Sequence, residues 1–426
     1  MPQIKEVLQD SNPWWKEKYT LEFKDREIYK QIKKFLPLPQ MIAFTGLRRV
    51  GKTTLMFKII QDYIKNGFDP RNIIYFSFDE FRATEIREVV SEYEKLLEKD
   101  FRKGNYLLLL DEIQKMANWE DQLKRIYDTF GKNVKIIVSG SESLLIRRTS
   151  KETLAGRLLE FKIDTLSFKE FLIFRGVTFE PLSLYEKELC KLFGEFMLTL
   201  GFPELVNIND KAIIKKYVKE SIVEKIFYID IPRIFKISDP SALEPLLNIL
   251  MEEPGQLLEI SEIAKELKIS RQTLSNYLAY LEESFLIRKL YNYSKNRRKV
   301  ERKLRKYYPT LISVDLLFKE DDLSKSKVFE WFIVNQLKAE FFWRDPYQKE
   351  VDIILIENDR ALPIEVKYGK VDFVGLSTFM RRYQVSQGLV ISMWEEREQK
   401  IGDKTVSITP AFKYLLIRRD EAVAKQ

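Results

Sequence analysis

Residues 41–165 alternate between short, continuous apolar runs and longer stretches in which apolar residues recur with helical spacing. A run of this length suits one buried strand, and the stretches between the runs are long enough for helices. The alternation therefore predicts a parallel sheet with helices on both of its faces. The expected strands are 41–45, 73–78, 106–110 and 134–138, and a helical pattern near 26–35 precedes them.

The pattern changes twice before it returns to alternating helix and strand. Residues 166–240 keep helical spacing without the strand rhythm, and residues 241–290 form shorter helical segments with a tight break. From residue 311 onward, helix and strand alternate again. We therefore expect an α/β multi-domain chain. Its expected parts are a parallel-sheet core with an N-terminal helical segment at 1–165, a helical lid at 166–240, a winged helix-turn-helix at 241–310 and a further α/β domain at 311–426.

The loop after the first expected strand fits the phosphate-binding pattern G-x-x-x-x-G-K-S/T. Glycines let the backbone approach phosphate, the lysine reaches the β- and γ-phosphates, and the next hydroxyl is placed for Mg²⁺. A simple glycine turn would not require all these residues in register behind a strand. The pattern therefore predicts binding of ATP or GTP. The expected contacts are Gly46, Arg48, Arg49, Gly51, Lys52, Thr53 and Thr54.

Two carboxylates, Asp111 and Glu112, follow the expected strand 106–110 and are typical of a second nucleotide motif. Asp111 would hold Mg²⁺ through water, together with Thr53, and Glu112 would orient or deprotonate the attacking water. Ser139 or Ser141, in the small polar residues that end the strand 134–138, would sense the γ-phosphate. A simple strand-end turn is an equal alternative for these serines.

An arginine near the γ-phosphate would stabilise charge in the transition state. Arg157 is the candidate for this catalytic role, from its own subunit or from a neighbouring one. Arg147 and Arg148 compete for the same role, and many arginines are only solvated surface charges. An arginine acting on a neighbour would require a homo-oligomer.

Residues 243–290 have the pattern of a helix-turn-helix, with helices at 243–251, 261–267 and 271–283. Ser261 would cap the second helix, and an apolar run at 285–290 would open a β-wing. The outer face of the third helix suits DNA recognition. The candidates on that face are Arg271, Gln272, Ser275 and Asn276.

Positive charge is clustered just after this helix-turn-helix. Residues 288–306 hold ten lysines or arginines and one acid, Glu301. Such clustering is what electrostatic binding of DNA requires. A helical module with a solvated basic tail, or one that contacts protein, is the alternative. The further DNA-binding candidates are Arg297, Arg298, Arg302 and Lys303.

A set of carboxylates and a lysine stands out in the last part of the chain. Glu330 lies in a helix-like stretch, Asp352 in a strand, and Glu365 and Lys367 in a strand that returns after a turn. Residues i and i+2 share one face of a strand, so Glu365 and Lys367 point the same way and a hairpin brings Asp352 beside them. The carboxylates would hold Mg²⁺ or Mn²⁺ against a scissile phosphate, and Lys367 would orient water or stabilise charge. A salt-bridged sheet face is the structural alternative.

Composition narrows the chemistry that is open to the 426 residues. Histidine is absent, which excludes Ser-His-Asp and Cys-His catalysis and every His-ligated metal. The single cysteine, Cys190, rules out an internal disulfide. No apolar stretch approaches the roughly 20 residues that span a bilayer. With no signal-peptide pattern at the N-terminus, we expect a cytoplasmic protein. The net charge of +8 favours a nucleic-acid partner only because the basic residues are clustered in one segment.

Together these segments resemble the archaeal and bacterial AAA-type ATPases that carry a winged helix and a C-terminal nuclease-like domain. The resemblance rests on 46–54, 110–114 with Trp119, 139–141, 154–157, 166–171, 201–204, the helix-turn-helix, 350–352 and 364–367. The last two segments are similar to the PD-(D/E)xK nuclease fold, including archaeal Holliday-junction resolvases, although Val351 stands where the pattern has proline. The resemblance implies a restriction-endonuclease-like domain in which Glu330, Asp352 and Glu365 bind metal and Lys367 is catalytic.

Two hypotheses for the function follow. In the first, the chain is a DNA-binding ATPase that uses ATP and Mg²⁺ and has metal-dependent nuclease capacity in its last domain. In the second, it is an ATP-driven regulatory switch whose winged helix binds DNA or a protein partner, with a non-catalytic last domain. The complete set Glu330, Asp352, Glu365 and Lys367 favours the first.

Overall fold

The computed structural model describes residues 3–81, 84–131, 133–140, 153–226, 228, 231, 241–296 and 305–424, with side chains to residue 417. The candidates Arg147, Arg148, Arg297, Arg298, Arg302 and Lys303 lie outside the described residues. The chain forms two compact units, residues 1–166 and 167–426, and each is described by itself.

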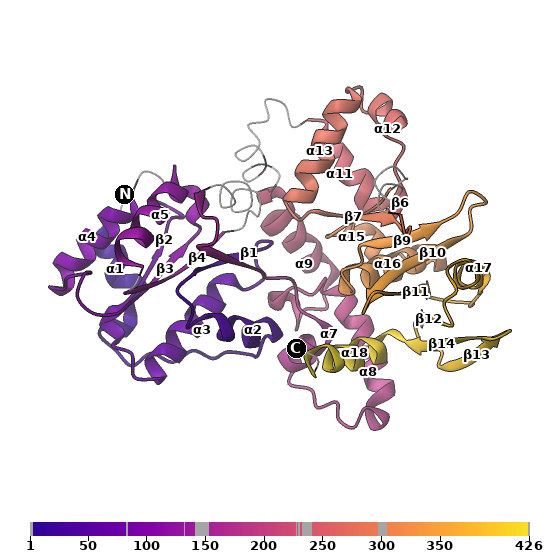
Figure 1. The fold of residues 1–426 in the computed structure, drawn as a ribbon, viewed down its shortest axis with the longest axis horizontal. Coiled ribbons are helices and arrows are strands. Elements are labelled where there is room, and N and C mark those ends of the chain that lie inside the picture. The colour runs from indigo at the N-terminus through magenta and orange to yellow at the C-terminus, as the bar shows by residue number, and fades with distance from the viewer. Residues whose placement is uncertain are drawn as a thin grey trace. The chain divides into compact units, whose positions relative to one another are not determined.

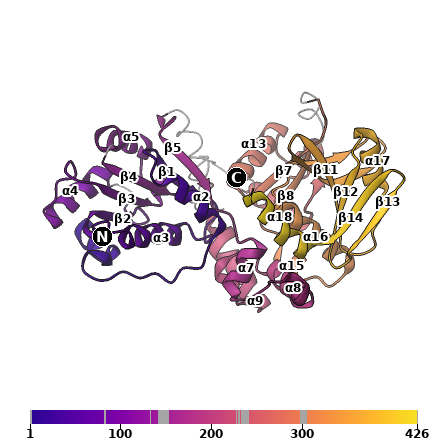
Figure 2. The same cartoon turned by 60° about the horizontal axis from the view of Figure 1, so that its bottom comes forward.

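The first unit is built on a five-stranded parallel sheet with the strand order β2-β3-β4-β1-β5. The helices α4 and α5 lie on one face of this sheet and α3 lies on the other (Figure 2). Its strands are β1 (Met41–Thr45), β2 (Ile73–Ser77), β3 (Tyr106–Asp111), β4 (Val134–Ser139) and β5 (Leu158–Lys162). Its helices are α1 (Ile4–Ser11), α2 (Glu27–Phe35), α3 (Lys52–Lys65), α4 (Ile86–Leu97) and α5 (Trp119–Phe130). The sequence therefore predicted the parallel sheet and its first four strands correctly.

The fifth strand was not predicted because it has no continuous buried run. β5 lies at the sheet edge beside β1, and its five residues are only half-buried or exposed. An edge strand needs apolar residues on fewer sides than a central strand. Its short mixed pattern therefore did not stand out from a loop.

The N-terminal segment covers the opposite edge of the sheet, at β2. The side-chain amide of Asn12 donates to the carbonyl oxygen of Tyr75, and its Oδ1 accepts from the Tyr75 N–H. Trp14 and Trp15 both donate from Nε1 to the carbonyl of Ile73. These side chains occupy backbone groups that an exposed edge would offer to another chain.

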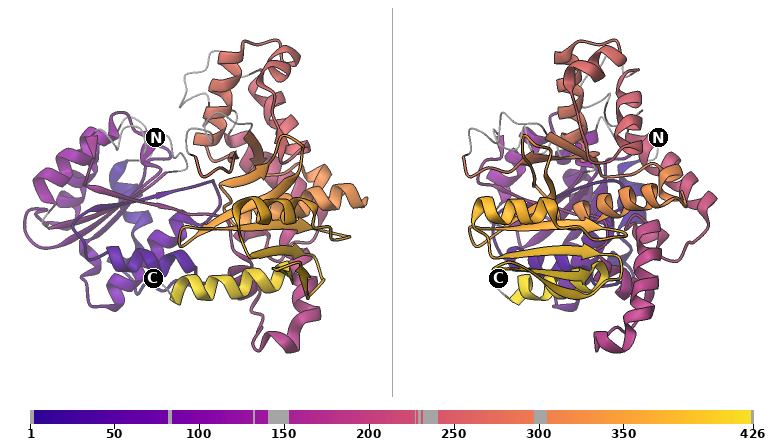
Figure 3. Two further views of the ribbon diagram at one scale, coloured as in Figure 1. Left: turned by 45° about the vertical axis from the view of Figure 1, so that its right-hand side comes forward. Right: turned by 90° about the vertical axis from the view of Figure 1, so that its right-hand side faces the viewer.

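The second unit begins with helices and continues into a sheet of nine strands with the order β13-β14-β12-β11-β10-β9-β7-β8-β6. The strands of this sheet are visible from two sides in Figure 3. Its helices include α7 (Phe168–Arg175), α8 (Leu182–Leu198), α9 (Lys211–Lys216), α11 (Leu243–Glu252), α12 (Ile260–Glu266), α13 (Arg271–Glu283), α15 (Val314–Leu317), α16 (Asp322–Gln336), α17 (Val374–Tyr383) and α18 (Ala411–Ala424). The strands are β6 (Gln256–Leu257), β7 (Ile287–Asn292), β8 (Arg305–Pro309), β9 (Phe341–Arg344), β10 (Glu350–Glu357), β11 (Arg360–Lys367), β12 (Gln387–Ser392), β13 (Arg397–Ile401) and β14 (Lys404–Pro410).

The three helices α11, α12 and α13 are followed by the antiparallel pair β7 and β8, as the sequence pattern indicated. This pair is not a separate hairpin, because β7 also pairs in parallel with β9. The side chain of Asn292 strengthens the junction: it donates to the Arg344 carbonyl and accepts from the Arg344 N–H. The subdivision expected at residue 310 therefore falls inside one continuous sheet (Figure 1).

One face of the C-terminal strands is covered by α17. Trp343, Phe379 and Met380 are buried between this helix and the sheet, in a cluster with residues of β10, β12 and β14. Each such side chain contributes about 1.5–3 kcal/mol by leaving water. The contact is close at Gly375, where an added Cβ would lie 1.7 Å from the Glu350 carbonyl oxygen. The helix therefore fixes the start of β10, which carries Asp352.

Candidate functional site

The loop between β1 and α3 has the geometry that phosphate binding requires. Gly46 and Gly51 both have positive φ angles, 136° and 95°. A Cβ at Gly46 would lie 2.2 Å from the Ile163 carbonyl oxygen, so only glycine fits there. Gly51 precedes the first residue of α3, so the amino end of this helix faces the loop. The loop and the helix N-terminus together provide backbone N–H groups and a favourable field for an anion.

Lys52 is buried and lies over this loop. Its Nζ donates to the carbonyl oxygens of Gly46 and Leu47, at 3.1 and 2.9 Å. The ammonium group is therefore held at the concave side of the loop, next to the glycine backbone. Arg48 is half-buried and Arg49 is exposed in the same loop, and Thr54 is exposed on α3.

The structure brings Thr53 and Asp111 together. The Thr53 hydroxyl donates to Asp111 Oδ2 at 2.7 Å, and the hydroxyl of Tyr75 donates to the same oxygen at 2.9 Å. Ser139 donates to the other oxygen of Asp111 from the neighbouring strand. A hydroxyl and a carboxylate at this distance fit the oxygen donors that Mg²⁺ prefers, so these residues are suited to hold it.

The strand order explains how Ser139 reaches this place. β4 lies between β1 and β3, so its carboxyl end is flanked by the phosphate loop and by Asp111. Ser139 also lies 3.4 Å from the backbone nitrogen of Glu112. Ser139 therefore lies between the phosphate loop and Asp111, and its role in sensing the γ-phosphate stays a prediction. The other candidate, Ser141, lies outside the described residues.

Glu112 follows Asp111 in a left-handed backbone conformation with φ of 52°. Its carboxylate accepts a hydrogen bond of 2.6 Å from the Gln114 side-chain amide. Burial raises the pKa of Glu112, Lys52 opposes this effect, and the Asp111 charge adds to it. A carboxylate with a raised pKa close to the phosphate loop is suited to accept a proton from water.

Arg26 holds the loop from outside and was not among the expected site residues. Its guanidinium donates to the carbonyl of Val50 at 2.9 Å and to that of Asp164 at 2.8 Å. The residue is 6% exposed. It therefore fixes the end of the phosphate loop to the segment after β5. No local sequence motif marks this contact, because its partners are 24 and 138 residues away.

Arg157 lies far from the phosphate loop of its own chain. Its backbone carbonyl accepts from the N–H of Met41, at the start of β1, whereas the loop follows the end of that strand. The five residues of β1 put roughly 13–17 Å between the Arg157 backbone, at the start of the strand, and the phosphate loop, at its end. The Arg157 side chain pairs with Asp128 at 3.1 Å. A role in its own site does not fit this position, and a role on a neighbouring subunit stays a prediction.

The predicted outer face of the third helix is solvent-exposed. α13 buries Leu274, Tyr277, Leu278 and Leu281, as its spacing indicated. Its four DNA-binding candidates, Arg271, Gln272, Ser275 and Asn276, are all exposed. The N-cap expected at Ser261 was wrong: α12 begins at Ile260, so Glu259 precedes it and Ser261 lies within the first turn.

The C-terminal carboxylates come from three elements of the second unit. Glu330 lies on α16, Asp352 on β10, and Glu365 and Lys367 on β11. Antiparallel pairing of β10 and β11 brings Asp352 beside Glu365, and Asp352 Oδ2 accepts from the Val366 N–H at 2.8 Å. Lys367 Nζ lies 2.9 Å from Glu365 Oε1. The hairpin therefore assembles two carboxylates and a lysine in the way the spacing predicted.

Asp352 and Glu365 are both buried, and burial is the main cause that raises the pKa of each. The negative charge of Glu330 also raises the pKa of both carboxylates. Glu365 Oε2 is buried without a hydrogen-bond partner. An orphaned carboxylate oxygen beside a second carboxylate fits a bound cation. Across the described part of the chain, however, no group of three or more His, Cys, Asp or Glu side chains is arranged to hold a metal ion.

Glu330, the third predicted carboxylate, is contacted by two residues of β8. Tyr308 donates to Glu330 Oε1 at 2.6 Å, and Lys306 Nζ lies 3.6 Å from the same oxygen. Lys306 also pairs with Glu350 at 2.5 Å. Burial lowers the pKa of Lys306, but its acidic neighbours raise it by more, so the ammonium stays charged. No sequence pattern singles out this lysine, which is one of ten basic residues between 288 and 306.

Comparison with known proteins places this architecture in a family. An uncharacterized protein of Methanocaldococcus jannaschii, MJ1544, is 30% identical over 372 residues, which are 85% of this chain and 77% of that protein. The chain belongs to the same family as MJ1544. A second protein of that organism, MJ1637, is 27% identical over 83% of this chain and 80% of its own length. An uncharacterized protein of Haemophilus influenzae is 28% identical over 64% of each chain.

Family models divide the chain into three matched regions. Residues 39–172 match the family described as an AAA domain, which contains the phosphate loop, Asp111 and Glu112. The first unit is therefore an AAA-type P-loop domain. Residues 190–310 and 325–414 match two domains of unknown function, DUF8612 and DUF4143. The first of these contains α13, and the second contains the carboxylates and Lys367.

Similarity to solved structures is low. The ORC1 protein of Aeropyrum pernix in complex with DNA matches with a TM-score of 0.34 and 14% identity, over 75% of this chain and 95% of that one. A RuvB variant of Thermotoga maritima matches with a TM-score of 0.33 and 16% identity, over 67% and 94% of the two chains. At these TM-scores the likeness defines neither the fold nor the function of this chain.

Within the described residues, no helix combines the length and the apolar character needed to cross a membrane.

Proposed function

We propose that this chain is an ATP-hydrolysing AAA-type ATPase that binds DNA and has Mg²⁺-dependent nuclease capacity in its second unit. The observation that carries the ATPase part is the contact of Thr53 with Asp111 beside the buried Lys52. Bound Mg²⁺ would neutralise phosphate charge. Lys52 and the loop N–H groups bind and orient the phosphates, and Glu112 accepts the proton of the attacking water.

The ATPase part is tested by measuring ATP turnover and ATP binding of Lys52→Ala. We expect turnover to be lost, since Lys52 supplies the charge that the phosphates require. Lys58→Ala is the matched control, because Lys58 lies on the same helix and pairs with Asp62 away from the loop. Undiminished turnover in Lys52→Ala would contradict the assignment of this loop.

DNA binding is supported by the exposed polar face of α13 and by the clustered basic residues that follow it. Removing the charges at Arg297, Arg298, Arg302 and Lys303 should weaken DNA binding and flatten its dependence on salt. With fewer phosphates neutralised, binding releases fewer counterions from the DNA. Binding is measured by fluorescence anisotropy over a series of salt concentrations. An unchanged affinity and salt slope would exclude this segment as the DNA contact.

Nuclease capacity is supported by the convergence of Asp352, Glu365 and Lys367 and by the buried, unpartnered Glu365 Oε2. Asp352 and Glu365 would hold Mg²⁺ or Mn²⁺, and Lys367 would orient water or stabilise the leaving charge. The test is metal-dependent cleavage of branched, single-stranded and duplex DNA by the wild type and by Asp352→Ala. Asp359→Asn is the matched control, since it lies at the turn at the other end of the same hairpin.

A second candidate function is a regulatory switch with a non-catalytic second unit. It is favoured by Lys306, whose ammonium already neutralises Glu330 and Glu350. Under this alternative, ATP binding controls the contact of α13 with DNA or protein, and no DNA is cut. Cleavage that requires a divalent metal and disappears in Asp352→Ala would exclude it.

A further inference from the structure

Trp394 differs from the other tryptophans of the chain in its exposure. The chain has six tryptophans. Five of them are 6% exposed or less, whereas Trp394 is 55% exposed. A large aromatic side chain that stays exposed has a ring face available to a ligand or a partner.

Trp394 is not a loosely held side chain. Its ring meets that of Tyr368 edge to face, with the centroids 5.3 Å apart. Tyr368 in turn meets Phe329, which is buried on α16, at 6.1 Å. The three rings form a continuous row from the core to the surface, and we call Tyr368 and Trp394 the aromatic pair.

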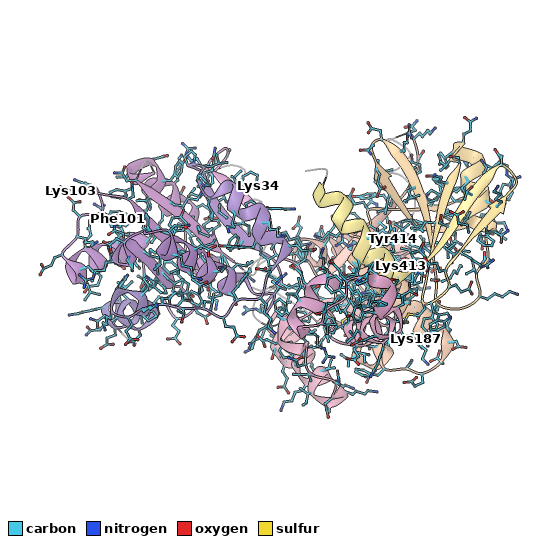
Figure 4. All side chains as sticks on the ribbon, turned by 90° about the horizontal axis from the view of Figure 1, so that it is seen from below. Lys34, Phe101, Lys103, Lys187, Lys413 and Tyr414 are labelled. Carbon is cyan, nitrogen blue, oxygen red and sulfur yellow. The ribbon has the colours of Figure 1, made fainter. Side chains whose placement is uncertain are left out.

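The loop that carries Trp394 is fixed on both sides. The hydroxyl of Ser392 donates to the Glu395 carbonyl at 2.6 Å. Lys413 on α18 pairs with Glu396 at 2.6 Å and with Glu186 on α8 at 3.5 Å. Figure 4 labels Lys413 on this helix. A preorganised aromatic side chain loses little conformational entropy when a ligand stacks on it.

The aromatic pair lies next to Asp352, Glu365 and Lys367, which we call the carboxylate–lysine site. Tyr368 directly follows Lys367 in the chain, and Lys367 is the register partner of Ser392, two residues before Trp394. β11 and β12 are parallel, so both aromatic residues leave the sheet at the same carboxyl end. A ligand whose phosphate lies at Lys367 can therefore place an adjoining group on the pair.

The charges around the pair do not favour one sign. Lys367 lies beside Asp372 at 3.2 Å, Lys413 is paired with Glu396, and Arg397 is paired with Glu395. A surface of balanced charge does not attract a phosphate backbone by itself. Recognition here would depend on the flat faces of the rings. Nucleobases stack on tryptophan and tyrosine, but only where they are not already stacked inside a duplex.

We propose that the aromatic pair is a stacking platform for an unpaired nucleobase of DNA, beside the carboxylate–lysine site. The inference rests on the proposed function and deepens it: the substrate of this site is DNA with unpaired bases next to the bond that is cut. A protein surface that buries Trp394 is the competing occupant, and the test separates the two.

The test measures binding of an oligothymidylate and of a matched duplex, in EDTA and in the Asp352→Ala background, so that no cleavage occurs. Trp394→Leu removes the ring but keeps an apolar side chain, whereas Trp394→Phe keeps a ring. We expect Trp394→Leu to weaken single-strand binding by roughly 5- to 150-fold, with Trp394→Phe close to the parent. Duplex binding should stay equal in all three proteins.

Tryptophan fluorescence gives an independent readout, because the other five tryptophans are buried. Oligothymidylate should quench a component of the emission that acrylamide also quenches and that is missing in Trp394→Phe. Equal single-strand affinity of the leucine and phenylalanine variants would overturn the proposal. A change of oligomeric state in Trp394→Leu with unchanged DNA binding would also overturn it, in favour of a protein contact.

Cleavage assays separate this inference from the function on which it rests. If no DNA is cut but single-strand binding depends on Trp394, the nuclease proposal fails and the platform stands. If wild type cuts duplex and single-stranded substrates equally and Trp394→Leu leaves both rates unchanged, the platform fails and the nuclease stands.

Discussion

Lys306 gives the most informative prediction about the second unit, because this buried lysine pairs with two acids, Glu330 and Glu350. The substitution Lys306→Met keeps an unbranched apolar side chain of similar length. The ammonium that it removes lies 6.0 Å from the ring centre of Tyr308 and 5.6 Å from that of Phe342. The same ammonium lies 2.5 Å from Glu350 and 3.6 Å from Glu330. The change therefore tests charge with little change of volume.

The expected loss of stability follows from the burial of these partners. Removing one member of a buried ion pair costs about 3–5 kcal/mol, because the other charge is left uncompensated. The side chains of Glu330 and Glu350 are 28% and 24% exposed, so water screens part of the remaining repulsion. We therefore expect about 3 kcal/mol, which lowers the Tm of a unit of this size by about 6–12 °C.

The assay is calorimetric unfolding of the whole chain with and without ATP. ATP binds the first unit, so it raises the Tm of that unit, and the transition that does not respond belongs to the second. Lys327→Met is the matched control, since its pair with Glu253, at 2.6 Å, is nearly as short as the 2.5 Å pair of Lys306 with Glu350 but lies at the surface. An exposed pair of this kind contributes about 0–1 kcal/mol.

Divalent metal should distinguish a cation site from a simple salt bridge. If the carboxylates can bind Mn²⁺ once the ammonium is gone, Mn²⁺ should stabilise Lys306→Met by more than the wild type. Adding Glu350→Gln to Lys306→Met should recover part of the lost stability. Equal stability of the two lysine variants, Lys306→Met and Lys327→Met, would refute the reasoning from burial.

Three further predictions concern the first unit and the exposed face of α13. Arg26→Met should weaken ATP binding by roughly 5- to 150-fold in calorimetric titration, because the buried carbonyl of Val50 and the partly buried carbonyl of Asp164 lose their donor; unchanged affinity would contradict its positioning role. Glu112→Gln should abolish turnover and raise the Tm at neutral pH. Burial raises the folded-state pKa of Glu112 above its unfolded value, so stability falls as the pH rises from the unfolded to the folded pKa, and the full cost is present above the folded pKa; a lowered Tm would contradict this sign. Arg271→Ala with Gln272→Ala should weaken duplex binding in anisotropy, and equal binding would show that α13 is not the contact.

The nucleotide site was predictable from the sequence because its chemistry is local. Gly46, Gly51, Lys52 and Thr53 lie within one loop and helix start, and the strand before them has an unbroken apolar run. Asp111 was recognisable for the same reason, at the end of another buried strand. What the sequence could not show is which side chains hold these groups from a distance, as Arg26 does.

The carboxylate–lysine site was predictable only in the part that one hairpin builds. Asp352, Glu365 and Lys367 come together through the pairing of two consecutive strands, which the turn between them indicates. Lys306 enters from β8, and its partner Glu350 is 44 positions later in the chain. Such contacts depend on how strands that are distant in the chain pair in one sheet. The spacing of apolar residues predicts single elements, and it does not predict these pairings.

The junction of β7 with β9 changes how the second unit can be divided. A cut at residue 310 would separate β8, with Lys306 and Tyr308, from the acids that they contact. It would also break the parallel ladder at Tyr291 and Asn292 and expose an edge on each fragment. The strands β7 and β8, which follow α13, therefore belong to the same sheet as the strands that carry Asp352, Glu365 and Lys367. The parallel pairing of β7 with β9 joins the two parts across residue 310.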